Sequence, residues 1–283
     1  MISALEYRNK NEILMKEYEE SVRAWLANFG NKELAEIIPF FRDGVICPEK
    51  WFEYGNDFRP LFILKEVSLG INGSPKINEL IEELQSWLKQ WGGQKYFEFV
   101  ENPFDDIKVG SFSQWRRIAR LAAGLEETYL YGSGKRYYDL DLSFHEGGEM
   151  YKGDIAGYKT KKYLHRTANP NYDSIINKMA VIEIKKIGAG KSVGSALSKA
   201  TLPFEKHIDP FESLLCRQID LIDPTVIICL GRHNGNCISA LLENVKRNTS
   251  DRLWIDGYHH TYSSNLHFFE EPIEEFGRFY SKK

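Results

Sequence analysis

The sequence contains few cysteines, and none of them are paired at a spacing typical of metal sites. Cys47, Cys216, Cys229 and Cys237 form no Cys-x-x-Cys pair, which argues against a zinc site or an iron–sulfur cluster. Cys229 lies within an apolar run, as a core residue does. Reduced thiols fit a cytoplasmic protein. We therefore expect no metal and no other cofactor.

The chain also lacks long hydrophobic runs. No stretch approaches the roughly 18 apolar residues that a membrane-spanning helix needs. The first ten residues carry Glu6, Arg8 and Lys10 and no apolar core of a signal peptide. We expect a cytoplasmic protein that makes no membrane contact.

An excess of positive charge is absent as well, because the formal net charge is −3. Binding to a nucleic acid would therefore require a local basic patch. Hydrophobic residues make up 42% of the chain, enough for a sizeable core. The 13% of aromatic residues would suit a base-stacking pocket, but they would fill a core equally well.

Apolar periodicity predicts strands that alternate with helices. Helices are expected at 11–27, 77–91, 112–123, 211–221 and about 236–246, and buried strands at 61–64, 179–184, 225–230 and just before Tyr258. This order is typical of an α/β fold, a three-layer α/β/α arrangement around a central, mainly parallel four-stranded sheet. We expect one domain over 1–283, with an N-terminal helical extension at 1–40 and an irregular insertion at about 131–171.

Polar residues follow three of the predicted strands. These groups are Lys65-Glu66, the residues from Glu183 to Ser192, which include a predicted loop from Lys185 to Ser192, and His259-His260-Thr261. Ligands of open parallel sheets bind at the carboxyl ends of the strands, so we expect the three groups to converge there.

An ordered set of motifs resembles the uracil-DNA-glycosylase superfamily, in particular its divergent bacterial members, over roughly residues 40–265. The motifs are Asp43-Gly44, Phe62-Ile63-Leu64-Lys65-Glu66, Ile184-Lys185-Lys186, Ile222-Asp223-Pro224 with the strand up to Gly231, and Tyr258-His259. The resemblance implies a DNA glycosylase that flips a base out of DNA and cuts its glycosidic bond, leaving an abasic site.

The resemblance also assigns residues to roles. Val67 stands where the family's water-activating aspartate would fall, so Glu66 is the nearest catalytic carboxylate. The family's histidine maps to His259, or to His260 if the alignment shifts by one residue. Glu66 would stabilise the sugar cation or orient water, and the histidine would donate to the leaving base. Glu66 as an ion-pair partner of Lys65 and His259 as a structural histidine remain open alternatives.

Further residues are assigned to base and phosphate contacts. Glu183 stands where the family has a base-reading Asn, and the other predicted base contacts are Lys65, Val67 and Tyr262. DNA-phosphate contacts are predicted for Ser68, Lys185, Lys186, Gly190, Lys191, Ser192, Thr261 and Ser263.

Two alternative functions remain open at this point. Val67 favours a catalytically inactive nucleic-acid-binding protein of the same fold. Gly188-Ala189-Gly190-Lys191-Ser192 partly matches the phosphate-binding loop of a nucleotide hydrolase, although Lys185 stands where that motif has a glycine.

Glu183 also bears on the choice of base. An ionised carboxylate only accepts hydrogen bonds, which matches the amino group of cytosine rather than the O4 of uracil. Normal cytosine must be spared, so Glu183 favours a 5-substituted cytosine, as in modified phage DNA, with a uracil-type base as the alternative substrate. We expect a role in antiviral defence, with DNA repair as the alternative setting. We expect a monomer with DNA as its partner and no obligate protein partner.

Overall fold

The computed structural model describes residues 2–29, 32–52, 57–68, 76, 78–82, 85, 113–131, 177–189, 195–233, 236–258, 268 and 271–280. For Glu66, Val67 and Ser68 it describes the backbone only. The predicted insertion at 131–171 lies, apart from Tyr131, outside the described residues.

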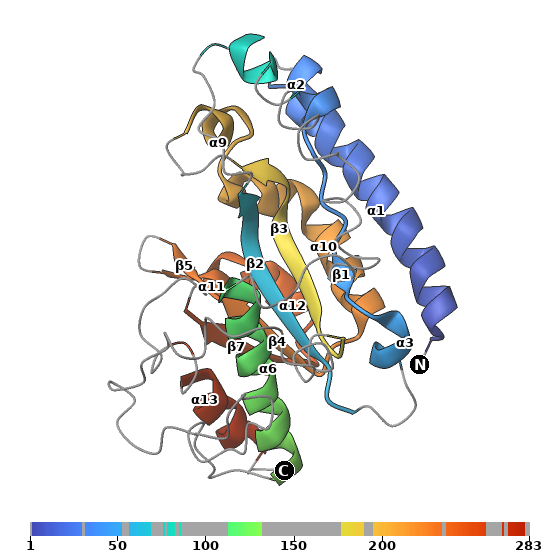
Figure 1. The fold of residues 1–283 in the computed structure, drawn as a ribbon, viewed down its shortest axis with the longest axis vertical. Coiled ribbons are helices and arrows are strands. Elements are labelled where there is room, and N and C mark those ends of the chain that lie inside the picture. Colours follow the sequence, from blue (N-terminus) through green and yellow to red (C-terminus); the bar gives the residue numbers. More distant parts are fainter. Residues whose placement is uncertain are drawn as a thin grey trace.

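A five-stranded, mostly parallel sheet forms the centre of the molecule (Figure 1). Its strands are β1 (Gly44–Val45), β2 (Pro60–Ser68), β3 (Ala180–Ala189), β4 (Val226–Leu230) and β7 (Leu253–Gly257), in the spatial order β1-β3-β2-β4-β7. Only β1 runs antiparallel to its neighbour. The mixed α/β architecture is therefore confirmed, but the expected four strands are five, because Gly44 of the Asp43-Gly44 motif begins an edge strand.

Apolar side chains cover both faces of the sheet, as buried parallel strands require. One face packs against α6 (Ser113–Tyr131) and α13 (Glu271–Tyr280). The other face packs against α10 (Ile208–Ile222), α11 (Ile238–Leu241) and α12 (Glu243–Asn248). Alternate residues of β2 separate accordingly: Phe62 and Leu64 face α6, whereas Leu61 and Ile63 face α10.

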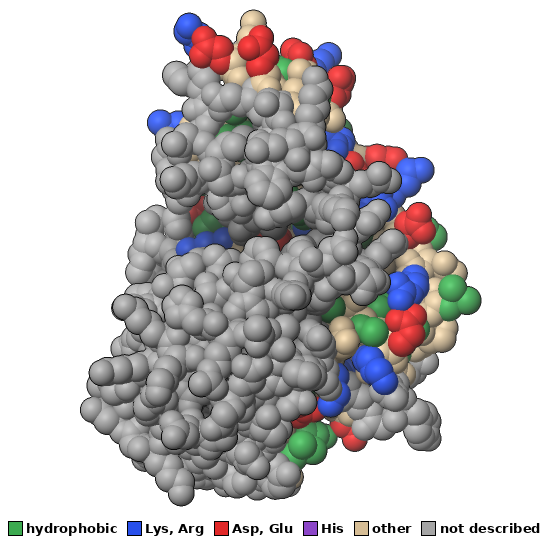
Figure 2. Space-filling view, in the orientation of Figure 1, with side chains coloured by type: hydrophobic (Ala, Val, Ile, Leu, Met, Phe, Trp, Pro, Cys, Tyr) green, Lys and Arg blue, Asp and Glu red, His purple; other side chains and the backbone are tan. Residues whose placement is uncertain are grey.

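The N-terminal helices belong to the packed fold. Helix α1 (Ala4–Ala27) begins at the N-cap Ser3, whose hydroxyl accepts from the backbone N–H of Glu6 at 3.1 Å. Its buried side contacts α2 (Lys32–Ile37), α3 (Pro48–Trp51) and α10. Its outer side mixes Lys and Arg with Asp and Glu, as Figure 2 shows along the edge that α1 forms. The visible edge of α1 is therefore not a basic patch for DNA.

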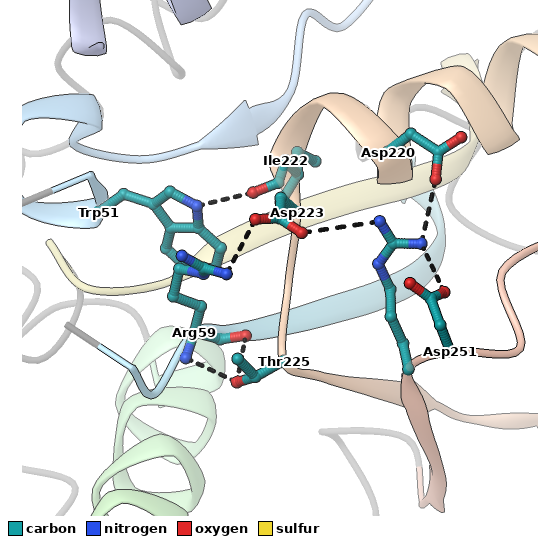
Figure 3. A network of polar contacts seen from close by, with 8 residues as sticks. Trp51, Arg59, Asp220, Ile222, Asp223, Thr225 and Asp251 are labelled. Carbon is teal, nitrogen blue, oxygen red and sulfur yellow. Dashed lines mark hydrogen bonds and ion pairs between the residues drawn. The ribbon is translucent and has the colours of Figure 1, made fainter. Parts of the chain in front are cut away.

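An ion-pair network holds together the amino ends of the parallel strands, at the edge opposite their carboxyl ends (Figure 3). Arg59, just before β2, pairs with Asp223 at 2.9 Å, and Arg252, just before β7, pairs with Asp220 at 3.0 Å. Trp51 donates its indole N–H to the carbonyl of Ile222 at 2.8 Å. In this chain the Ile222-Asp223-Pro224 motif therefore connects elements and lies away from the predicted site.

Several predicted boundaries are wrong. Strands β2 and β3 continue to Ser68 and Ala189, through residues that we expected to form loops. Helix α6 continues to Tyr131, beyond the predicted end at residue 123. The predicted helix at 236–246 is divided into β6 (Asn236–Cys237), α11 and α12.

Gly44 cannot be replaced without strain. Its φ of +143° lies in a region that side-chain-bearing residues rarely adopt, and an added Cβ would meet the hydroxyl of Tyr7. We expect Gly44→Ala to lower the free energy of unfolding by about 1–3 kcal/mol, measured by urea denaturation. In a Tyr7→Phe background the loss should be smaller, because the clash is removed and only the backbone cost remains. An equal loss in both backgrounds would contradict the contact with Tyr7.

Candidate functional site

The parallel strands place the predicted site at one edge of the sheet. Strands β2, β3, β4 and β7 all end at this edge, at Ser68, Ala189, Leu230 and Gly257. The chain passes from β2 to β3 on one side and from β4 to β7 on the other. The order of the strands therefore reverses between β2 and β4, which is where ligands of open α/β sheets bind.

The strands end at different heights. Leu64 and Glu183 pair in register, and they lie at the level of Leu230 and Gly257, where β4 and β7 stop. Strands β2 and β3 extend further as a two-stranded ribbon. Glu66, which pairs in register with Lys185, lies on this extension. The carboxyl edge of the sheet therefore has a step. Glu183 lies at the lower level, where β4 and β7 end, and the backbone of Glu66 lies on the part of β2 that extends beyond it.

The histidines of the predicted site lie beyond the described part of β7. Tyr258 follows the end of β7 directly, so the chain enters this segment at the carboxyl edge. Strand β4 separates β2 from β7, which corresponds to about 10 Å between their backbones. Proximity of Glu66 and His259 stays a prediction. The predicted site residues outside the described part of the chain are Gly190, Lys191, Ser192, His259, His260, Thr261, Tyr262 and Ser263.

A hydrogen bond from its backbone fixes Glu183 at the level where β4 and β7 end. Its N–H donates to Oδ2 of Asp43 at 2.6 Å, and the residue is 8% exposed. It alternates with Ile182 and Ile184, which face α10, so its side chain shares the opposite face with Val181 and Leu64. This is the face that α6 covers.

Lys65 does not join Glu183 in one pocket. Its Nζ lies 5.5 Å from the ring centre of Phe204, which belongs to η5 (Phe204–His207) and packs on the α10 face. The two residues therefore lie on opposite faces of the sheet. The structure therefore does not bring Lys65 and Glu183 together on one face, and a contact of Lys65 with the base stays a prediction.

Lys186 is a buried structural residue and not a phosphate contact. Its side chain is fully buried, and its Nζ donates to both carboxylate oxygens of Asp43 at 2.7 Å. Gln218 of α10 donates to Oδ1 of the same carboxylate, also at 2.7 Å. Burial lowers the pKa of Lys186, while the carboxylates of Asp43 and Glu183 act in the opposite direction. A DNA phosphate in solvent cannot reach this ammonium group.

Lys185 is likewise corrected. It is fully buried, and its Nζ donates to the hydroxyl of Thr201 and to the carbonyl of Leu202, each at 2.8 Å. These acceptors follow α9 (Ala196–Ala200). Because β3 runs through Lys185 to Ala189, Gly188 and Ala189 belong to the strand and not to a phosphate-binding loop. The partial match to a nucleotide hydrolase is weakened for the same reason.

A buried histidine lies beside Lys185. His207 is 1% exposed, donates from Nε2 to the carbonyl of Thr201 at 2.9 Å, and packs edge-on against Trp25. Burial lowers its pKa to about 3, so the ring is neutral at physiological pH. This histidine serves packing and has no access to a substrate.

His207 should make the protein sensitive to acid. Below pH 6.5 the unfolded chain takes up a proton that the folded chain binds only near pH 3, so stability falls as pH falls. We expect a loss of up to about 1.4 kcal/mol per pH unit from this group. Urea denaturation between about pH 7 and pH 5 should show a flatter profile for His207→Gln than for the wild type. Parallel profiles would contradict the assignment.

A hairpin that directly follows β4 was not predicted from the sequence. Strands β5 (Arg232–His233) and β6 pair directly after β4, in register Arg232↔Cys237. The signal was the dipeptide Asn234-Gly235 between them, which is typical of two-residue hairpin turns. Asp256 near the end of β7 accepts from the hydroxyl of Ser239 in α11 at 2.6 Å and so ties the segment after the hairpin to the sheet.

Metal and membrane features are absent from the described part of the chain. There, no three His, Cys, Asp or Glu side chains are grouped as metal ligands would be. None of the helices described is both long and apolar enough to span a bilayer. Comparison with protein-family models, curated proteins and solved structures finds no match to this chain.

Proposed function

We propose that this chain is a DNA glycosylase that hydrolyses the N-glycosidic bond of a flipped-out base. The observation that carries the proposal is the shared edge of the sheet. The strand bearing Glu66, the strand bearing Glu183 and the strand leading to Tyr258-His259 all reach it, on either side of the point where the strand order reverses. The resemblance to the uracil-DNA-glycosylase superfamily rests on these same segments.

The chemistry of bond cleavage suits these residue types. The transition state places positive charge on the sugar and negative charge on the departing base. Glu66 supplies a carboxylate that stabilises the sugar cation or orients water, and His259 donates to the departing base, with His260 in reserve. Glu66 lies near the carboxyl end of β2, and the segment that carries His259 begins at the end of β7.

Glu183 is the proposed reader of the base. It lies level with the ends of β4 and β7, and the carboxylate of Asp43, which directly precedes β1, binds its backbone N–H. A carboxylate accepts from the exocyclic amino group of cytosine, which uracil lacks. We therefore propose a 5-substituted cytosine as the substrate, with Val67 and Tyr262 as further pocket residues.

Phosphate binding is proposed for a smaller set than the sequence suggested, because Lys185 and Lys186 are buried. Hydroxyl and glycine residues can bind phosphate through side-chain O–H and backbone N–H groups. The remaining proposed contacts are Ser68, Gly190, Lys191, Ser192, Thr261 and Ser263. The acidic net charge of the chain agrees with a contact of this small extent.

A second candidate is a catalytically inactive DNA-binding protein of the same fold. The observation in its favour is Val67, which cannot activate water where the family has an aspartate. In that case Glu66 would have no part in bond cleavage, and only the contacts to DNA would remain.

One assay separates the two candidates. Duplex and single-stranded DNA carrying uracil, cytosine or a bulky 5-substituted cytosine is incubated with the protein, and abasic sites are detected by strand cleavage in alkali. Cleavage at the 5-substituted cytosine supports the proposal. Binding in a gel-shift experiment, with no cleavage on any of the DNAs, supports the inactive alternative and refutes the glycosylase.

A further inference from the structure

Asp43 completes the hydrogen bonding of β3 where the edge strand stops. Strand β1 pairs with β3 only at Gly44↔Val181 and Val45↔Ala180, and the next bridge on this side is Phe40↔Ile187. Between them the N–H of Glu183 meets no backbone carbonyl of β1. The carboxylate of Asp43 replaces that carbonyl, accepting from the Glu183 N–H at 2.6 Å.

Two further donors, besides the Glu183 N–H, fix the carboxylate of Asp43. Lys186 donates to both of its oxygens, and Gln218 donates to Oδ1. Lys186 is fully buried and Asp43 is 6% exposed. Since Gln218 belongs to α10 and Lys186 to β3, the position of Asp43 is set by the sheet and a core helix together.

The peptide of Glu183 is thus held on both of its edges. Strand β2 pairs with it at Leu64, and Asp43 binds its N–H from the other side. The orientation of this peptide sets the Cα–Cβ direction and so the position of the Glu183 carboxylate. A rigid strand position with charge-assisted support is what accurate recognition of a ligand requires.

We propose that Asp43 is a positioning residue that determines base specificity by holding Glu183 in place. This inference rests on the proposed role of Glu183 as the reader of the base. It adds that selectivity for a cytosine derivative over uracil depends on a residue that does not touch the base.

The test compares Asp43→Asn with Gln218→Met. The Asn variant replaces the ionised acceptor of the Glu183 N–H by a neutral amide. The Met variant removes another hydrogen bond to the same carboxylate but leaves the Glu183 N–H contact in place. Because Asp43→Asn strands the buried Lys186 charge, the measurements are repeated in Asp43→Asn combined with Lys186→Met, with Lys186→Met alone as its reference.

Two readouts are taken on each full-length variant. The first is the amide proton shift of Glu183 in protein labelled with ¹⁵N-glutamate, because an N–H bound to a carboxylate resonates downfield. The second is the ratio of excision rates for 5-substituted cytosine and uracil. We expect Asp43→Asn to move the amide upfield and to lower the ratio by at least about tenfold, while Gln218→Met preserves both.

Failure of the inference can be told apart from failure of the proposed function. An unmoved amide in the Asp43 variants would overturn the positioning role, whatever the activity. A moved amide with an unchanged ratio would overturn the link to specificity. If the wild type excises no base, the proposed function fails, and with it the role of Glu183 that Asp43 is proposed to support.

Discussion

Replacing Lys186 with Met is expected to lower the free energy of unfolding by about 3–5 kcal/mol, because it leaves the carboxylate of Asp43 buried without its cation. The two charges are 2.7 Å apart, and the Lys186 side chain is fully buried. Gln218 and the Glu183 N–H would remain as donors to Asp43, but neither carries a charge to compensate it.

Urea denaturation at neutral pH measures this loss. Lys76→Met is the matched control, since Lys76 pairs with Glu79 on the surface, where both side chains are more than half exposed. The control should change the stability by less than about 1 kcal/mol. Adding Asp43→Leu to Lys186→Met should restore part of the loss, because the stranded charge is then gone. A loss in Lys186→Met as small as that of the control would contradict the buried pair.

Glu66→Gln is expected to reduce base excision by about 10²–10⁴-fold, the usual contribution of a positioned acid or base. The amide keeps the shape of the side chain but can neither stabilise the sugar cation nor take a proton from water. DNA binding should not weaken, because the substitution removes a negative charge and no phosphate contact.

Single-turnover excision rates and gel-shift affinities separate these effects. Glu79→Gln provides the control, as it neutralises a surface carboxylate outside the parallel strands. His259→Ala should also slow excision, whereas an effect of His260→Ala alone would move the assignment by one residue. An unchanged rate in Glu66→Gln would remove Glu66 from the catalytic site.

Elements with uniform apolar character were predicted well from the sequence. The strand expected at 225–230 differs from β4 by one residue, because every residue of Val226–Leu230 is buried. The C-terminal part of β3 was missed because Lys185 and Lys186 look like loop residues, and lysine is rarely buried. The partners that permit their burial include Asp43, which lies 143 residues from Lys186 in the chain.

The candidate site, too, could be predicted from the sequence only in part. Convergence of the strand ends follows from a parallel sheet, so the sequence was sufficient to place the backbone of Glu66 and Tyr258 at one edge. The face on which each side chain lies depends on register, and this is why Lys65 and Glu183, both assigned to the base, are on opposite faces. The hairpin at Arg232–His233 was within reach of the sequence, through Asn234-Gly235.

The most direct test of the central claim is mass spectrometry of the free base released from DNA. The wild-type protein is incubated with a duplex carrying a single bulky 5-substituted cytosine and, separately, with the same duplex carrying uracil. The account predicts release of the intact modified base from the first duplex, an abasic site in the strand that remains, and no release by Glu66→Gln. Release of no free base from either duplex, or of uracil alone, would contradict it.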